Sequence, residues 1–295
     1  MAAVTRADET IAAFVEQILV QSPLKAAGFI VTIYGDVVEP RGGVAWIGNL
    51  IETCAEVGIS ETLVRTAVSR LVASGQLSGE REGRRSYYRL SPSAGDEFAA
   101  AARVLFGEQQ DNSWQFVHVT GPAPEDTMLE LDRAGYARIS ARLAVGPTRP
   151  LAMPATLVFK ADAARDAPAL QDFAAEHWDL DRHASAYRAF IAQFMPIADH
   201  ADAQALAPKT ALTVRLLLIH RFRSVLLHDP RLPALALPAD WPGKAARQLF
   251  ARLYQQLSPH ADEYVTRSFV TASGPFAPLT RATDLRLAML AREVL

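Results

Sequence analysis

The chain has 295 residues, of which 50% are hydrophobic and 21% charged, a composition typical of a globular protein large enough for two or three domains. No apolar run reaches the ~20 residues of a membrane-spanning helix, and the N-terminal residues lack a signal-peptide layout, so we expect a cytoplasmic protein without a membrane partner. Cys54 is the single cysteine, which excludes an internal disulfide and a cysteine-rich metal cluster. The formal net charge of −2 argues against a uniformly basic surface, but residues 58–90 hold six arginines and three glutamates, a local excess of +3.

The first 57 residues predict helices separated by proline and glycine. Apolar residues at helical spacing predict a helix over 11–20, which ends before Ser22-Pro23. The apolar segment 28–38 is rich in β-branched residues, and its pattern fits either a helix or a strand. Residues 44–57 predict a further helix, with Cys54 on its apolar side as a core residue.

A glycine turn and an amphipathic helix follow directly. Gly58 suits a left-handed helix end, and Ser60 can cap the next helix, which we predict over Ser60–Ser74. At 100° per residue the apolar side chains of this helix cluster on one face: Leu63, Val64, Ala67, Val68 and Leu71. The polar side chains fall on the opposite face: Thr62, Arg65, Thr66, Ser69 and Arg70. Helix, glycine turn and helix in this order are typical of a helix-turn-helix.

A basic hairpin follows the amphipathic helix, which Gly75 ends. Segments 76–80 and 84–90 predict two strands around a Glu82-Gly83 turn. Three arginines surround the tip of this hairpin: Arg81, Arg84 and Arg85. We interpret Tyr87 and Tyr88 as packing residues rather than base-stacking ones. A basic hairpin after the second helix indicates a winged helix-turn-helix.

The pattern changes again after residue 98. A closing helix is predicted over 98–106 and a polar linker over 107–112. Beyond the linker we predict strands over 114–119, 137–145 and 156–160, and helices over 124–134 and from 168 to about 195. This order indicates a small ferredoxin-like α+β domain, and the residues from 196 onward are mostly helical.

Five segments carry a family resemblance: GFIVTIYGDVVEPRGGVAWIGNLI (28–51), VRTAVSRL (64–71), GRRSYYRLS (83–91), EHWDLDRHASAYRAF (176–190) and RLLLIHRFRSVLLHDPRLPALALPADWPG (215–243). Together they resemble the PaaX-like family of phenylacetic-acid catabolism repressors over about residues 24–257. The resemblance implies a multidomain α+β fold. Its expected parts are a winged helix-turn-helix domain (25–108), a central ferredoxin-like domain (109–195) and a helical C-terminal domain (196–295). Residues 1–24 lie outside the resemblance, and we expect them to form an N-terminal helical extension.

The resemblance also implies a function. Members of that family are dimeric repressors released from operator DNA by an aryl-CoA thioester, typically phenylacetyl-CoA. We therefore expect double-stranded DNA, such a thioester and a second copy of the chain as partners, with no cofactor and no enzymatic activity. The polar face of the predicted helix would read the major groove, and the three wing arginines would bind phosphates or the minor groove. In isolation, an ordinary solvated helix face would show the same pattern.

Four basic side chains interrupt the apolar segment that follows residue 211, and three of them are candidates for effector binding. Arg215, His220 and Arg223 could together receive the phosphates of a CoA thioester. The alternative is that they pair with acidic residues and hold domains together, with three candidates for that role: Asp199, Asp202 and Asp229.

Two other classes of function stay open. An enzyme acting on nucleic acid or on CoA thioesters is one, although a metal-dependent nuclease needs converging carboxylates and the strand over 114–119 is followed by Thr120-Gly121-Pro122. His177 and His183 are six residues apart and do not form a helical metal-ligand pair, and no GxSxG motif is present. The other class is an architectural protein that binds DNA without sequence preference.

Overall fold

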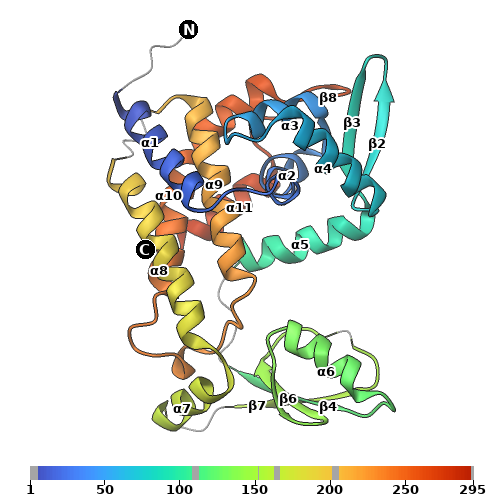
Figure 1. Cartoon of the computed structure of the whole chain (residues 1–295), viewed down its shortest axis with the longest axis vertical. Coiled ribbons are helices and arrows are strands. Elements are labelled where there is room, and N and C mark those ends of the chain that lie inside the picture. The colour runs from blue at the N-terminus through green and yellow to red at the C-terminus, as the bar shows by residue number, and fades with distance from the viewer. Residues whose placement is uncertain (1–5, 108–112, 152, 163–166, 201–205, 294–295) are drawn as a thin grey trace. The chain divides into compact units, whose positions relative to one another are not determined.

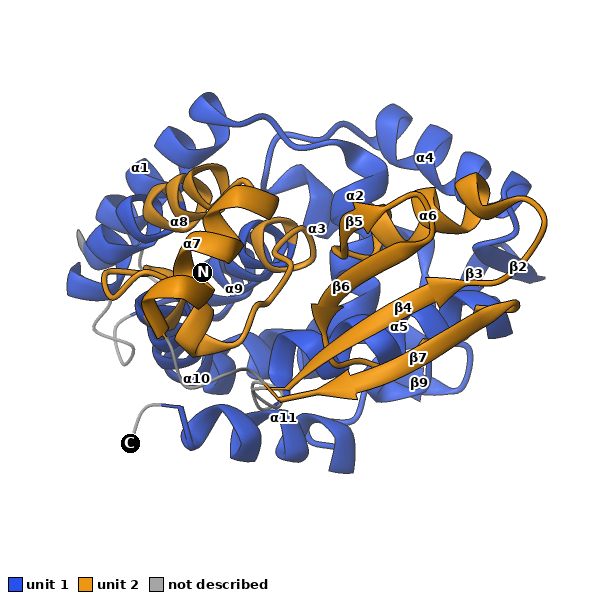
Figure 2. Ribbon diagram, turned by 90° about the horizontal axis from the view of Figure 1, so that it is seen from below, with its two compact units in different colours: residues 1–107, 190–223, 245–295 blue, residues 108–189, 224–244 orange. Residues whose placement is uncertain are grey.

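The computed structural model describes residues 6–107, 113–151, 153–162, 167–200 and 206–293 (Figure 1). Its contacts divide the chain into two compact units, coloured separately in Figure 2. The first unit comprises residues 1–107, 190–223 and 245–295, and the second comprises residues 108–189 and 224–244. The predicted boundary near residue 108 coincides with a unit boundary. The predicted helical domain 196–295 does not form a unit of its own, because most of it groups with the N-terminal residues.

The N-terminal part of the first unit is helical. The helix predicted over 11–20 is α1, Arg6–Gln21. The ambiguous segment 28–38 is helical: α2 (Ala26–Ile33) runs into a π-helical turn, Tyr34–Val38, and a 3-10 turn, Glu39–Arg41. Burial of Phe29, Ile30 and Ile33 stabilises α2 in this core more than β-branched residues weaken it.

The segment 44–57 was predicted as one helix, and this prediction is wrong at its beginning. Residues Val44–Trp46 form strand β1, and helix α3 spans Ile47–Ala55. β1 pairs antiparallel with β3 (Arg85–Leu90), with Trp46 opposite Tyr87, and β3 pairs with β2 (Leu77–Glu82), which gives the sheet order β1-β3-β2. The strand conformation of β1 therefore depends on a partner about 40 residues away in sequence.

Helix α4 spans Glu61–Ala73, and the glycines and the serine cap predicted at its ends are in place. Gly58 and Gly75 have φ angles of 77° and 73°, and the Ser60 side chain accepts a hydrogen bond from the Leu63 amide at 3.5 Å. The helix buries the predicted apolar side chains with one exception: Val64, Ala67, Val68 and Leu71 are buried. The assignment of Leu63 to the core is wrong, because its side chain is 56% exposed. At 100° per residue Leu63 lies about 90° from the centre of the buried stripe.

The first unit is completed by helices from both ends of the chain. The closing helix α5 spans Pro92–Phe106 and begins at the Ser91 cap, earlier than predicted. The C-terminal elements are α8 (Leu180–His200), α9 (Pro208–Leu226), α10 (Gly243–Ser268), β8 (Val270–Thr271), β9 (Gly274–Pro275) and α11 (Arg281–Ala291). The unit boundaries fall within three of these helices. The second unit includes α8 up to residue 189, α9 from residue 224 and α10 up to residue 244. No helix within the described ranges is long and apolar enough to cross a bilayer.

The second unit contains a four-stranded antiparallel sheet. Its strands are β4 (Trp114–Val119), β5 (Ala137–Ser140), β6 (Leu143–Pro147) and β7 (Thr156–Ala161), in the order β5-β6-β4-β7. The prediction of one strand over 137–145 is wrong, because the chain turns there and the Ser140 hydroxyl accepts from the Arg142 amide at 3.4 Å. Such a serine turn lacks the glycine or proline that marks most tight turns.

Helices pack on both faces of this sheet, and each face contributes to a separate hydrophobic cluster. Helix α6 (Pro124–Arg133) packs on the face that carries Val117 and Val119. The opposite face, with Trp114, packs against α7 (Ala167–His177) and the 3-10 turn Ala234–Ala236. The predicted single helix from 168 to about 195 is two helices, because the chain breaks at Trp178-Asp179 and the Asp179 carboxylate accepts from the Arg182 amide at 3.1 Å.

Candidate nucleic-acid interface

The polar face of α4 is exposed along its whole length. The five side chains predicted to face DNA are all exposed: Thr62, Arg65, Thr66, Ser69 and Arg70. They share one face because the buried side chains occupy the other, as the helical period requires. The Thr66 hydroxyl donates to the Thr62 carbonyl at 2.8 Å.

Arg65 is held by an ion pair on the same helix. Its guanidinium lies 2.7 Å from the Glu61 carboxylate, and the two side chains are 56% and 57% exposed. An exposed pair at this i, i+4 spacing is worth less than about 1 kcal/mol, so Arg65 can leave Glu61 at little cost. A guanidinium released in this way can form two parallel hydrogen bonds to a guanine edge.

A groove separates α4 from the β2–β3 hairpin, which lie side by side in Figure 1. Its α4 side is lined by Arg65, Ser69 and Val72. Its hairpin side is lined by Gly79, Glu80, Arg81, Ser86 and Tyr88, and Ile47 of α3 completes the lining. The hairpin therefore continues the polar face of α4 as one surface.

The hairpin presents three exposed arginines: Arg81, Arg84 and Arg85. The Arg85 guanidinium lies 4.9 Å from the centre of the Trp46 ring, a cation–π contact that positions it. Tyr87 is 5% exposed, as expected for a packing residue, and the Tyr34 hydroxyl anchors the hairpin by donating to the Tyr88 carbonyl at 2.9 Å. Such fixed, exposed cations suit contacts with phosphates.

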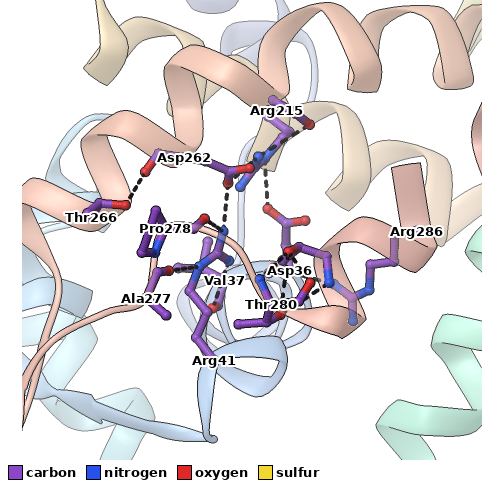
Figure 3. A network of polar contacts seen from close by, with 12 residues as sticks. Asp36, Val37, Arg41, Arg215, Asp262, Thr266, Ala277, Pro278, Thr280 and Arg286 are labelled. Carbon is purple, nitrogen blue, oxygen red and sulfur yellow. Dashed lines mark hydrogen bonds and ion pairs between the residues drawn. The ribbon is translucent and has the colours of Figure 1, made fainter. Parts of the chain in front are cut away.

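Arg215, from the group predicted to bind an effector, is a buried structural residue (Figure 3). Its guanidinium lies 2.9 Å from Asp36 and 2.8 Å from Asp262, and its side chain is 1% exposed. Burial lowers the pKa of Arg215, but the negative charges of Asp36 and Asp262 outweigh this effect and raise it overall. Arg215 thus pairs with acidic residues, as the alternative expected, but its partners Asp36 and Asp262 were not among the three candidates. Of those candidates, Asp229 accepts from the Tyr187 hydroxyl at 2.5 Å, and Asp202 lies outside the described residues.

Arg41 extends this buried cluster. Its guanidinium donates to Asp262 at 2.8 Å and to the carbonyl of Ala277 at 3.1 Å (Figure 3). The Tyr254 hydroxyl donates to Asp36 at 2.9 Å. The cluster joins the turn after α2 to α9 and α10. Sequence reasoning missed Asp36, Arg41 and Asp262, since ion pairs between residues up to 221 positions apart leave no local pattern.

His220 and Arg223 contact α2. The Nδ1 atom of His220 lies 2.9 Å from the Thr32 hydroxyl, and Arg223 donates to the Gly28 carbonyl at 3.2 Å. Burial, reinforced by the neighbouring Arg223 and Arg221, lowers the pKa of His220 to about 4. Both side chains therefore already have protein partners, and their role in effector binding stays a prediction.

The part of the chain that the structure describes contains no group of three histidine, cysteine or acidic side chains arranged to hold a metal ion. Cys54 is fully buried, and burial raises the pKa of its thiol to about 12.

Comparison with known proteins assigns the family. Two family models match, "PaaX-like protein" over residues 25–94 and "PaaX-like protein C-terminal domain" over residues 178–267. The transcriptional repressor PaaX of Escherichia coli strain K12 is 31% identical over 282 residues, which cover 88% of this chain and 89% of that protein. The chain belongs to the PaaX-like family.

The family assignment confirms the resemblance and covers the surface described above. The first family match includes all of α4 and the hairpin, and the second includes Arg215, His220 and Asp262. A solved structure, the uncharacterized protein Rv0674 from Mycobacterium tuberculosis, matches 74% of this chain and 91% of its own at 23% identity, with a TM-score of 0.46. That likeness is too distant to support an argument about the fold.

Proposed function

We propose that the protein is a DNA-binding transcriptional repressor of phenylacetate catabolism genes. The observation that carries this proposal is the continuous exposed surface of α4 and the β2–β3 hairpin, in a homologue of a named transcriptional repressor. Residues 25–108 act as a winged helix-turn-helix. Helix α4 lies in the major groove, where Arg65 and Arg70 contact base edges and Thr62, Thr66 and Ser69 contact bases or phosphates. Arg81, Arg84 and Arg85 hold the flanking phosphates.

The second unit serves as a scaffold and pairing surface in a homodimer. The strand order of its sheet is that of a ferredoxin-like domain, although the residues described between β6 and β7 contain no helix. Strand β7 lies at an edge of the sheet, and three consecutive apolar side chains on it are 45–56% exposed: Leu157, Val158 and Phe159. An exposed apolar edge strand is a template for pairing with another strand. A dimer built on it would read a palindromic site with half-sites a whole number of helical turns apart.

An aryl-CoA thioester such as phenylacetyl-CoA releases the protein from DNA. Three basic side chains are the candidates for its binding site: Arg215, His220 and Arg223. To bind the thioester they would have to give up their present contacts, which are with Asp36, Thr32 and the Gly28 carbonyl respectively. The thioester can shift the DNA equilibrium only by binding the DNA-free state more tightly than the DNA-bound one.

Selection of duplexes from a random pool, followed by fluorescence anisotropy at fixed salt with and without phenylacetyl-CoA, tests this function. Selective binding that the thioester weakens and free phenylacetate does not is the expected result. Selective binding that phenylacetyl-CoA does not change would support the repressor assignment and exclude phenylacetyl-CoA as the inducer. Binding without sequence preference would favour an architectural protein, and hydrolysis of the thioester or metal-dependent cleavage of DNA would favour an enzyme.

A further inference from the structure

Leu63 is an exposed apolar side chain in the first turn of the DNA-facing helix. It is 56% exposed, while Val64 beside it is fully buried. The core therefore does not account for a leucine at this position. The first turn is also where recognition helices most often contact base edges.

The helical period places Leu63 at one border of the polar face. Taking Thr62 as the reference, Thr66 and Ser69 lie within about 40° of it around the axis and form the outward row. Leu63 and Arg70 lie about 80–100° to one side, whereas Arg65 and Val72 lie on the other side, in the groove next to the hairpin. Leu63 and Arg70 thus form the border of the polar face opposite the hairpin.

In the major groove of DNA, one apolar group is available for contact with Leu63. The 5-methyl group of thymine projects into that groove, and the other base edges there present hydrogen-bond donors and acceptors. Arg65 and Arg70, which follow Leu63 on α4, together with the three arginines at the hairpin tip, give this surface the positive charge that a phosphate backbone complements. The same side chain would find no apolar partner on a phosphate or a ribose oxygen.

We propose that Leu63 is a specificity-determining residue that packs on the 5-methyl group of a thymine in each half-site. The inference rests on the proposed binding of DNA by α4 and adds a base to what that helix reads. Burying one methyl-sized group against Leu63 is expected to change affinity by about fourfold. The effect is confined to one thymine position per half-site, because a single side chain reaches a single methyl group.

A deoxyuridine scan of the selected duplex tests this contact. Each thymine is replaced in turn by deoxyuridine, which removes the methyl group and leaves the hydrogen-bonding edges unchanged. The affinities of the wild-type chain and of Leu63→Ala are measured on every duplex at the same salt concentration. Leu285→Ala is the matched control, because Leu285 is 54% exposed on α11, away from α4. Circular dichroism establishes that both variants fold, as expected for substitutions of exposed leucines by a strong helix former.

The expected result is a loss of about fourfold for the wild-type chain at one thymine position of each half-site, with no further loss there for Leu63→Ala. Leu285→Ala should show the same scan as the wild-type chain. Selective binding in which Leu63→Ala keeps the wild-type sensitivity at every thymine, or in which no thymine methyl group matters, overturns the inference and leaves the proposed function intact. Failure of the wild-type chain to select any duplex overturns the proposed function and the inference together.

Discussion

Replacing Arg215 by methionine removes the cation at the centre of the buried cluster in the first unit. In this variant Asp262 keeps its ion pair with Arg41 at 2.8 Å, whereas the fully buried Asp36 carboxylate keeps the hydrogen bond from the Tyr254 hydroxyl and loses the ion pair that balances its charge. Removing one partner of a buried pair costs about 3–5 kcal/mol, because an uncompensated charge stays in the interior. We expect Arg215→Met to lower the free energy of unfolding by that amount.

Urea denaturation followed by circular dichroism at pH 7 measures this loss. Adding Asp36→Asn removes the orphaned charge and keeps an oxygen for the Tyr254 hydroxyl, so the double variant should regain about 2 kcal/mol over Arg215→Met. Arg65→Met is the control for an exposed pair and should change stability by about 0.5 kcal/mol or less. An Arg215→Met variant within about 1 kcal/mol of the wild-type chain, or a double variant no more stable than Arg215→Met, would show that no uncompensated charge is left at Asp36.

Three further predictions concern single side chains. Glu61→Gln should raise affinity for the selected duplex by roughly two- to fivefold in anisotropy titrations, and more at low salt, because it frees Arg65 and removes a negative charge from the interface; an unchanged affinity would contradict the placement of both residues. His220 has its pKa lowered to about 4, so the unfolded chain binds the proton more tightly and the free energy of unfolding should fall as the pH is lowered from about 6.5 toward 4. Urea midpoints across this pH range should fall less in His220→Gln, and parallel curves would disprove the assignment. Cys54, with its pKa raised to about 12 by burial, should react with a thiol reagent such as DTNB in concentrated urea and not in the folded chain; rapid labelling of the folded chain would show that the thiol is accessible.

Local chemistry made α4 and the hairpin predictable from the sequence. Gly58 and Gly75 adopt the left-handed conformation that ends a helix, Ser60 caps α4, and Gly83 has a φ angle of 60° at the hairpin turn. Each of these signals acts over four residues or fewer, so the sequence displays it directly. The polar face of α4 follows from the same short-range period, and all five predicted side chains are exposed.

Pairings between distant segments account for what the sequence could not predict. Val44–Trp46 is a strand because β3 lies beside it, and the Asp36–Arg215 ion pair joins residues 179 positions apart. Arg215 in an apolar helix has the same local pattern whether its partner is a buried carboxylate or a ligand phosphate. The helical period alone could not predict the exposure of Leu63. A side chain at the border of the apolar face can be buried or exposed at the same helical angle.

If α4 reads the base sequence of the operator, the Arg65→Ala variant should have a lower specificity ratio than the wild-type chain. The ratio compares affinity for the selected duplex with affinity for a scrambled duplex at the same salt concentration. Loss of a guanine contact should lower this ratio by about 1–3 kcal/mol, or roughly five- to 150-fold. Arg84→Ala, at the hairpin tip, should weaken binding to both duplexes alike and leave the ratio unchanged. An Arg65→Ala variant that keeps the wild-type ratio would contradict the assignment of α4 as the element that reads DNA.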